Sequence, residues 1–375
     1  MSSGIEAIVM PKWGLAMQEG MLAAWSVEEG ATITKGQEIC DIETSKIANV
    51  FESPVSGTLR RRVTAEGETV PVGYLIAVCA PGSVDDAAID AFVDDFKANF
   101  VVDDAGAGGP EPKTVETGAG RIRYLEAGGG DALPLIFIHG FGGDYLSWML
   151  NQAELSADRT AYAIDLPGHG GSTKAVGQGD VGSLTAAVCA FMQAMDIARA
   201  HLVGHSLGGA IALDMVRNHP ELVASATLIA PAALGPDIEM DYIQGFIREK
   251  RAKKLRPYLE MLVHDPSMIS AEMVEEVIKF KRLDGAEEAL NTIANNCFDG
   301  GRQNLVLTER LPRMTRPIQV MWGKNDRILS PGHSVGLPPS IDVTLLDDAG
   351  HLPHMEKAEQ VNAGIEAFIT RHDGP

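Results

Sequence analysis

The sequence predicts a two-domain protein in which a small all-β domain precedes a larger, doubly wound α/β domain. Three observations support this fold class: a pattern that repeats within the first eighty residues, an acidic and then Gly- and Pro-rich segment after them, and beyond it apolar strands that alternate with amphipathic helices. At 375 residues the chain is long enough for two hydrophobic cores. We place the domains at residues 1–80 and 118–373, joined by a linker at 81–117.

The composition narrows the class of protein. Hydrophobic residues make up 45% and charged residues 22%, as in ordinary globular proteins. No apolar run approaches the ~20 residues that span a bilayer, the start lacks the pattern of a secretory signal, and the four cysteines lack metal-finger or C-x-x-C spacing. We therefore expect a cytoplasmic protein. A net charge of −20 repels phosphates and anionic lipid, so we expect neither nucleic acid nor a membrane as a partner.

Two stretches near the N-terminus share Glu-Gly, then Thr, a β-branched residue, Gly and Ile in register: EGATITKGQEI at 29–39 and EGETVPVGYLI at 66–76. Short β-rich segments separated by Gly and Pro predict two similar halves that close into a flattened barrel. Between them, CDIETSKIANV at 40–50 has two apolar runs around a polar centre. This pattern predicts a hairpin that presents Lys46 at its tip.

This region resembles the lipoyl domains of 2-oxo acid dehydrogenase complexes, through DIETSKI, the preceding EGATITKGQEI and Gly57 in SPVSGTL. The resemblance implies that Lys46 carries lipoate in amide linkage, attached by a lipoate ligase or lipoyl transferase. Biotin carriers share the fold but typically have Met on both sides of the lysine, whereas Ser45 and Ile47 flank it here. Lipoate is therefore the expected prosthetic group.

The segment at 81–117 predicts a tether. It opens with Pro-Gly, passes through an acidic amphipathic stretch at 86–99 that predicts one short helix, and ends in Gly, Ala and Pro. A flexible tether of ~30 residues has a root-mean-square span of roughly 30 Å, which corresponds to a millimolar effective concentration of its cargo.

After this linker, six apolar segments each read as a strand followed by a turn: LPLIFIHG, TAYAIDLPGHG, AHLVGHSLGG, SATLIAPAAL, RPIQVMWGKND and DVTLLDDAGH. Apolar runs of this length predict buried parallel strands joined by helical crossovers, and hence a doubly wound, mostly parallel sheet. Between residues 234 and 311 lies a Met- and charge-rich insertion of helical periodicity.

The segment GHSLGG at 204–209 follows a strand and precedes an amphipathic helix, which is the context that a G-x-S-x-G nucleophile elbow requires. Ser206 is therefore the candidate nucleophile. Negative charge that develops on a carbonyl oxygen during acyl transfer needs fixed donors. The backbone N–H groups of Phe141, in HGFGG after the first parallel strand, and of Leu207 are the candidate oxyanion hole.

A serine hydroxyl needs a base to take its proton and an acid to orient that base. His351 follows one late strand and Asp326 follows another, so both fall at the sheet edge where Ser206 lies. Asp347 and Asp348 lie within or just past the strand before His351, so Asp326 is the preferred acid. His354 and Glu356 lack further ligands nearby, so no metal site is expected.

Residues 118–373 resemble the α/β-hydrolase superfamily through HGFGG, DLPGHGGS, GHSLGG, WGKNDRI and AGHLPHME. The resemblance implies that the insertion at 234–311 is a helical cap over the active site. Its basic run, Arg248 to Arg256, is either a solvated helix face or a surface that attracts an anionic cofactor such as coenzyme A.

The union of the two domains resembles the acyltransferase component of acetoin-cleaving (acetoin dehydrogenase) systems. That resemblance implies transfer of an acetyl group from S-acetyl-dihydrolipoyl-lysine to coenzyme A, together with a thiamine-diphosphate-dependent acetoin-cleaving enzyme and a flavin dihydrolipoyl dehydrogenase. We also expect a homo-oligomer. Most acyltransferase components of oxo acid complexes instead carry an H-x-x-x-D-G motif, which is absent here. Two alternatives stay open: a thioester hydrolase that releases acetate, and a lipoyl carrier or assembly subunit with an idle hydrolase fold.

Overall fold

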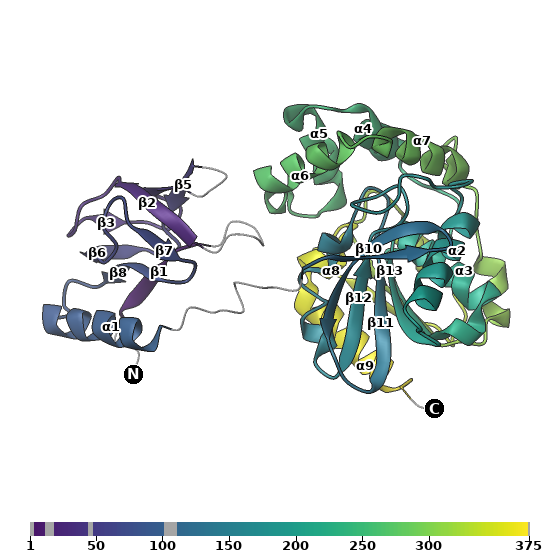
Figure 1. Cartoon of the computed structure of the whole chain (residues 1–375), viewed down its shortest axis with the longest axis horizontal. Coiled ribbons are helices and arrows are strands. Elements are labelled where there is room, and N and C mark those ends of the chain that lie inside the picture. The colour runs from purple at the N-terminus through teal and green to yellow at the C-terminus, as the bar shows by residue number, and fades with distance from the viewer. Residues whose placement is uncertain (1–3, 12–18, 44–47, 101–110, 374–375) are drawn as a thin grey trace. The chain divides into compact units, whose positions relative to one another are not determined.

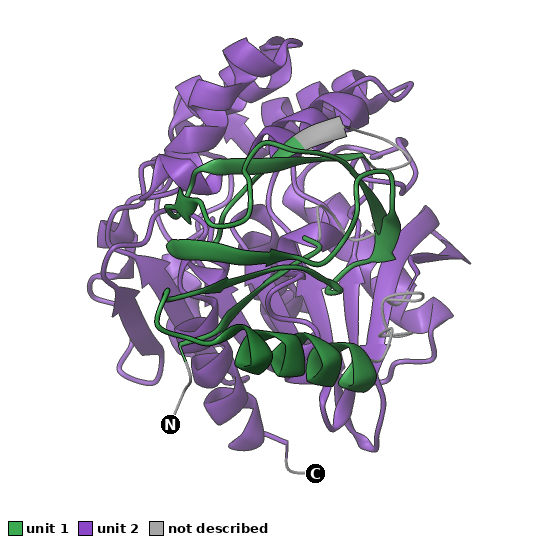
Figure 2. Ribbon diagram, turned by 90° about the vertical axis from the view of Figure 1, so that its left-hand side faces the viewer, with its two compact units in different colours: residues 1–109 green, residues 110–375 purple. Residues whose placement is uncertain are grey.

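A computed structural model of the chain describes residues 4–11, 19–43, 48–100 and 111–373. The chain divides into two compact units, residues 1–109 and 110–375 (Figure 2). Each unit has its own hydrophobic core. The predicted fold class is confirmed, because an all-β unit precedes an α/β unit with a mostly parallel sheet. No helix in the described ranges combines the length and apolar character that a bilayer crossing needs.

Two antiparallel sheets of four strands each form the small unit, with strand orders β1-β8-β6-β3 and β5-β4-β2-β7. Both sheets contribute apolar side chains to one shared core, such as Ile8 and Leu59 from one sheet and Leu22 and Ile42 from the other. The strands are β1 (Glu6–Val9), β2 (Glu19–Trp25), β3 (Thr32–Ile33), β4 (Glu38–Glu43), β5 (Ala48–Glu52), β6 (Gly57–Arg62), β7 (Thr69–Pro71) and β8 (Leu75–Ala80).

The sequence repeat corresponds to a structural repeat. In the first copy, a turn closed by the hydrogen bond from Gln37 N to Thr34 O (3.0 Å) leads from β3 to β4. In the second copy, the equivalent bond from Tyr74 N to Pro71 O (3.0 Å) leads from β7 to β8. Each copy therefore crosses from one sheet to the other, and together they tie the two sheets around the core.

The predicted hairpin is formed by β4 and β5, which pair antiparallel from Glu38 opposite Glu52 to Glu43 opposite Ala48. The connection between the strands comprises residues 44–47. Lys46 belongs to this connection and lies outside the described residues.

Helix α1 (Asp86–Asn99) covers the range predicted for a helix within the linker, and it packs against β8. Its buried Ile89 joins Leu75 and Val78 of β8 in a second apolar cluster. Because the amphipathic helix buries its apolar face in this way, α1 belongs to the small unit.

The large unit contains an eight-stranded sheet with the order β18-β17-β14-β13-β11-β12-β10-β9. The strands from β12 to β18 in this order run parallel, whereas β10 runs antiparallel to both of its neighbours. The strands are β9 (Lys113–Thr117), β10 (Gly120–Gly128), β11 (Ala132–Ile138), β12 (Arg159–Ile164), β13 (Ala200–His205), β14 (Val223–Ile229), β17 (Ile318–Gly323) and β18 (Asp342–Leu346).

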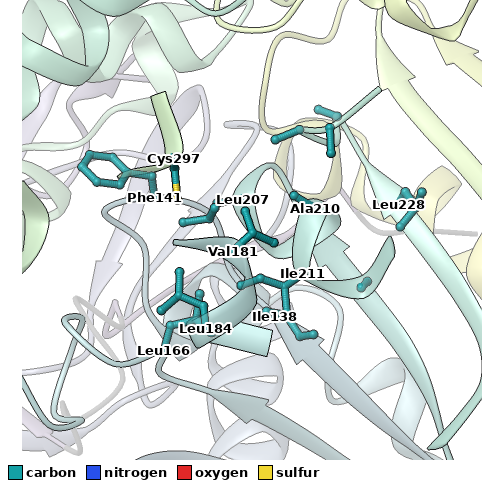
Figure 3. Packing of buried hydrophobic residues seen from close by; sticks show 14 of the residues in the cluster. Ile138, Phe141, Leu166, Val181, Leu184, Leu207, Ala210, Ile211, Leu228 and Cys297 are labelled. Carbon is teal, nitrogen blue, oxygen red and sulfur yellow. The ribbon is translucent and has the colours of Figure 1, made fainter. Parts of the chain in front are cut away.

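Alternate side chains of β11 belong to two hydrophobic cores on opposite faces of this sheet. Ile136 and Ile138 belong to the cluster that includes α2 (Val181–Ala194) and α3 (Leu207–Asn218), and Figure 3 shows part of it. Leu135 and Phe137 belong to the cluster that includes α9 (Ala358–Thr370). Burial on both faces accounts for the near-continuous apolar runs of the strand sequences.

Four helices between β14 and β17 form the predicted insertion, a group that stands apart from the sheet and its flanking helices (Figure 1). They are followed by a short hairpin, and we call helices and hairpin together the cap. Its elements are α4 (Met240–Arg248), α5 (Ala252–Leu259), α6 (Ala271–Lys281), α7 (Ala286–Cys297), β15 (Phe298–Asp299) and β16 (Arg302–Gln303).

Candidate active site

Ser206 lies in the sharp turn between β13 and α3. Its backbone has φ 53° and ψ −115°, a conformation that costs roughly 1–3 kcal/mol and persists only where the surroundings enforce it. Hydrogen bonds from Ser206 N to Ile229 O (3.0 Å) and from Ala232 N to Ser206 O (2.9 Å) hold the turn. A Cβ on Gly208 would lie 2.1 Å from Ile138 O, so only glycine lets α3 approach the sheet this closely.

The side chains of His351 and Asp326 are in direct contact, with 2.7 Å between His351 Nδ1 and Asp326 Oδ2. The Asp326 side chain is fully buried. Its Oδ1 accepts the backbone N–H groups of Ile328 (2.8 Å) and Leu329 (3.0 Å), and its Oδ2 also accepts Trp322 Nε1–H (2.8 Å). Because the carboxylate only accepts, His351 carries its proton on Nδ1, which leaves Nε2 free to act as a base.

His205 connects Ser206 to the His351 loop. Its Nε2 donates to the backbone oxygen of His351 (2.8 Å), and the two rings lie 4.7 Å apart. The Ser206 hydroxyl itself has no hydrogen bond to any part of the chain that the structure describes. The structure thus joins His351 to Asp326 and places Ser206 nearby without a direct bond to His351. Such bonds are often long before substrate binds.

The loop after β11 runs against the Ser206 turn. A Cβ on Gly140 would lie 3.0 Å from the Cβ of Ser206, so glycine is required at this close approach. Within the described ranges, the backbone N–H groups of Phe141 and Leu207 have no acceptor. An oxyanion hole needs two such free donors close to the nucleophile.

The cap covers this loop with aromatic side chains. A Cβ on Gly142 would lie 2.4 Å from the Phe246 ring of α4, so Phe246 rests on the loop backbone. The Phe141 ring lies 5.9 Å from that of Phe246 and 6.2 Å from that of Phe298. Only 8% of Ser206 and 2% of His351 are exposed, so the site is closed and apolar on its cap side.

Among the described residues, no group of three or more His, Cys, Asp or Glu side chains could hold a metal ion. Glu356 accepts the backbone N–H groups of Gly350 (2.6 Å) and His264 (2.5 Å) and so joins the loop before His351 to the cap. His354 is buried between the rings of His205 and Trp148, each 4.7 Å away. Glu356 and His354 therefore both contact other parts of the fold, which accounts for them as structural residues.

The motifs did not single out His205, Trp322 or Phe246, although all three contact predicted site residues. His205 and Trp322 were within reach of sequence reasoning, because one precedes the nucleophile and the other lies four residues before Asp326. Nothing in the sequence near Phe246 indicates that its ring covers the loop after β11.

Several buried histidines make the large unit sensitive to acid. Burial lowers the pKa of His139 and takes those of His169 and His205 well below the ordinary value; burial, then the nearby His351, lowers that of His354 to about 3. Below about pH 6.5 the unfolded chain takes up protons that the folded chain excludes. Folding stability is therefore full above that pH and falls as the pH drops toward these lowered values.

We predict that His354→Phe reduces the loss of folding stability at acid pH. Removing one such histidine should lower the slope of unfolding free energy against pH by about 1.4 kcal/mol per pH unit between pH 6 and 4. Urea unfolding followed by tryptophan fluorescence at successive pH values measures the slope. His219→Phe, which removes a partly exposed histidine, is measured beside it as the control for the loss of an imidazole. An unaltered slope in His354→Phe would contradict the prediction.

Comparison with known proteins agrees with this architecture. Residues 135–363 match the Alpha/beta hydrolase family and residues 6–79 match the Biotin-requiring enzyme family. A solved meta-cleavage product hydrolase from Pseudomonas fluorescens superimposes with a TM-score of 0.62 at 21% identity, covering 69% of this chain and 97% of its own. That likeness is one of fold alone.

Two curated relatives extend along the whole chain, and both are named dihydrolipoyllysine-residue acetyltransferase component of acetoin cleaving system. The protein from Pseudomonas putida is 43% identical over 372 residues, covering 99% of this chain and 100% of that protein. The one from Cupriavidus necator is 40% identical over 370 residues, covering 98% of each. Because both domains and nearly every residue are matched at this identity, the chain belongs to the family of dihydrolipoyllysine-residue acetyltransferase components of acetoin cleaving systems.

Proposed function

We propose that this protein transfers an acetyl group from a lipoyl arm on Lys46 to coenzyme A, through an acetyl ester on Ser206. The observation that carries the proposal is the buried pair of His351 and Asp326 beside the Ser206 turn. The names of the two full-length relatives support the acetyl chemistry and its place in acetoin cleavage. Its partners would be a thiamine-diphosphate-dependent acetoin-cleaving enzyme and a dihydrolipoyl dehydrogenase.

The small unit suits a covalent carrier. Strands β4 and β5 pair up to Glu43 and Ala48, so the four residues that include Lys46 form the connection of a hairpin. Lipoate in amide linkage to Lys46 would supply a thiol that carries the acetyl group as a thioester. The match of residues 6–79 to a carrier-domain family supports this role.

In the first half of the reaction, His351 Nε2 removes the proton from Ser206 Oγ, which attacks the thioester carbonyl carbon. The N–H groups of Phe141 and Leu207 donate to the oxygen as it becomes negative. The carbon–sulfur bond then breaks, and His351 returns its proton to the departing sulfur. The acetyl group is left as an ester on Ser206.

In the second half, His351 takes the proton of the coenzyme A thiol, and the sulfur attacks the acetyl ester. The bond to Ser206 Oγ breaks and His351 reprotonates the serine. Water would compete at this step. The aromatic cover of Phe141, Phe246 and Phe298 and the low exposure of Ser206 favour transfer over hydrolysis.

Removal of the nucleophile tests the proposal. With lipoylated, acetylated protein and coenzyme A, we expect Ser206→Ala to form acetyl-CoA at least about 10³-fold more slowly than the unaltered chain. Acetyl-CoA and acetate are quantified with and without coenzyme A, and intact mass verifies lipoate on Lys46. Acetate at equal rates in both would favour a thioester hydrolase. Undiminished transfer by the variant would favour a carrier with an idle hydrolase fold.

The role of Asp326 as the orienting acid can be tested against Asp347, a carboxylate at the same edge of the sheet. We expect Asp326→Asn to lower kcat by about 10⁴-fold, the scale that the same change produces in a serine protease, because the amide no longer fixes the His351 tautomer. Asp347→Asn removes an exposed carboxylate that pairs with Lys324, and kcat should stay within about twofold. Similar losses in both variants would show that Asp326 is not the orienting acid.

The cap side of the site should set acyl size. Because the Phe246 ring rests on the oxyanion loop, we expect Phe246→Ala to raise the ratio of butyryl to acetyl transfer by about tenfold, the scale of one or two methylenes in an apolar pocket. Phe280→Ala, in a cap phenylalanine that stacks on His169 instead, is the control. An unchanged ratio, with kcat/KM measured for both acyl donors, would remove Phe246 from the acyl pocket.

A further inference from the structure

Five exposed cations lie together on the cap of a chain whose net charge is −20. They occupy the end of α4, the three residues that follow it and the first turn of α5: Arg248, Lys250, Arg251, Lys253 and Lys254. Two of them have carboxylate partners within the cap, Arg248 with Glu249 (2.9 Å) and Lys250 with Glu287 (2.6 Å).

The other three, Arg251, Lys253 and Lys254, form no ion pair with the described residues. They face solvent because the opposite side of α5 buries Leu255 and Leu259 in the core of the large unit. Three like charges within four residues repel one another, and no ion pair with the described residues offsets that repulsion. An anion from outside the fold would relieve that repulsion. We call Arg251, Lys253 and Lys254 the basic surface.

The basic surface is joined to the His351 loop by a continuous helical element. Helix α5 continues into the turn Glu260–Leu262, whose last carbonyl accepts the backbone N–H of His351 (2.7 Å). Arg327 also donates to Val263 O (3.1 Å), which fixes the end of this element to the loop after Asp326. At 1.5–2.0 Å per residue, the eleven steps from Arg251 to Leu262 span about 16–22 Å.

We propose that the basic surface binds the phosphate groups of coenzyme A while the thiol of the same coenzyme A molecule reaches Ser206. This inference rests on the proposed acetyl transfer. Coenzyme A carries its diphosphate and 3′-phosphate at one end of a long flexible arm and its thiol at the other, so its charged end must bind well away from the reacting atoms. Arg251 can hold phosphate oxygens with paired N–H donors, and Lys253 and Lys254 add compact positive charge.

The charge of the rest of the chain gives the basic surface a second effect. A surface with an excess of carboxylates repels a polyanion, and a local cluster of positive charges then concentrates it at that place. Binding should accordingly weaken as salt rises. A thiol without phosphates should show neither the attraction nor the salt dependence.

The test compares coenzyme A with pantetheine, which has the thiol arm without the phosphates, as acetyl acceptors. In the triple variant Arg251→Gln, Lys253→Gln, Lys254→Gln, we expect KM for coenzyme A to rise at least tenfold, a scale of ~1.4 kcal/mol. We expect kcat and the KM for pantetheine to stay the same, and the salt dependence of KM for coenzyme A to be lost.

A control variant keeps the change in net charge equal. Arg302→Gln, Arg310→Gln, Arg313→Gln removes three exposed arginines of the large unit that form no ion pair in the described chain, and KM for coenzyme A should not change. An unaltered KM in the first variant, or equal losses with both acceptors, overturns this inference while the transfer function stands. Failure of the unaltered protein to acetylate either thiol overturns the proposed function instead.

Discussion

The rest of the site depends on the buried carboxylate of Asp326. Burial of an unpaired charge would be strongly destabilising, and here four hydrogen bonds offset that cost. Two come from the backbone just after Asp326, so the turn after β17 makes its own anion site. Trp322 and His351 supply the others, and the bond to His351 places the ring proton on Nδ1. In the proposed mechanism, this one buried carboxylate therefore orients the base.

The parts of this protein that could be predicted from the sequence are those in which the residues that carry the proposed chemistry also determine the local backbone structure. The Ser206 turn needs glycines at fixed offsets within one strand–helix junction, and the Lys46 connection needs a polar segment between two strands. Asp326 and His351 followed from the rule that parallel strands end at one edge of a sheet. Each of these arguments uses only a short stretch of chain.

Contacts between distant segments escaped prediction for a physical reason. The apolar face of α1 shows that the helix must pack on something, but its periodicity does not say that the partner is β8. In the same way, the sequence shows Phe246 only as an apolar residue of an amphipathic helix. Its contact with Gly142 depends on how the whole cap packs against the loop after β11. His205 precedes the nucleophile in sequence, yet its bond to the His351 backbone joins segments 146 residues apart.

Hydrogen bonds join the cap to the loop that carries His351, the proposed base. Leu262, at the end of the element that begins with α5, accepts the backbone N–H of His351, and Glu356 binds the backbone on both sides of the same junction. A displacement of α5 would therefore act on the loop that carries His351, because backbone hydrogen bonds join the two. In the proposed transfer, the same apolar cover that shields an acetyl ester on Ser206 from water must also make way for the acyl donor and for the thiol. Entry of either substrate and the position of the proposed base are thus linked through one element of the cap.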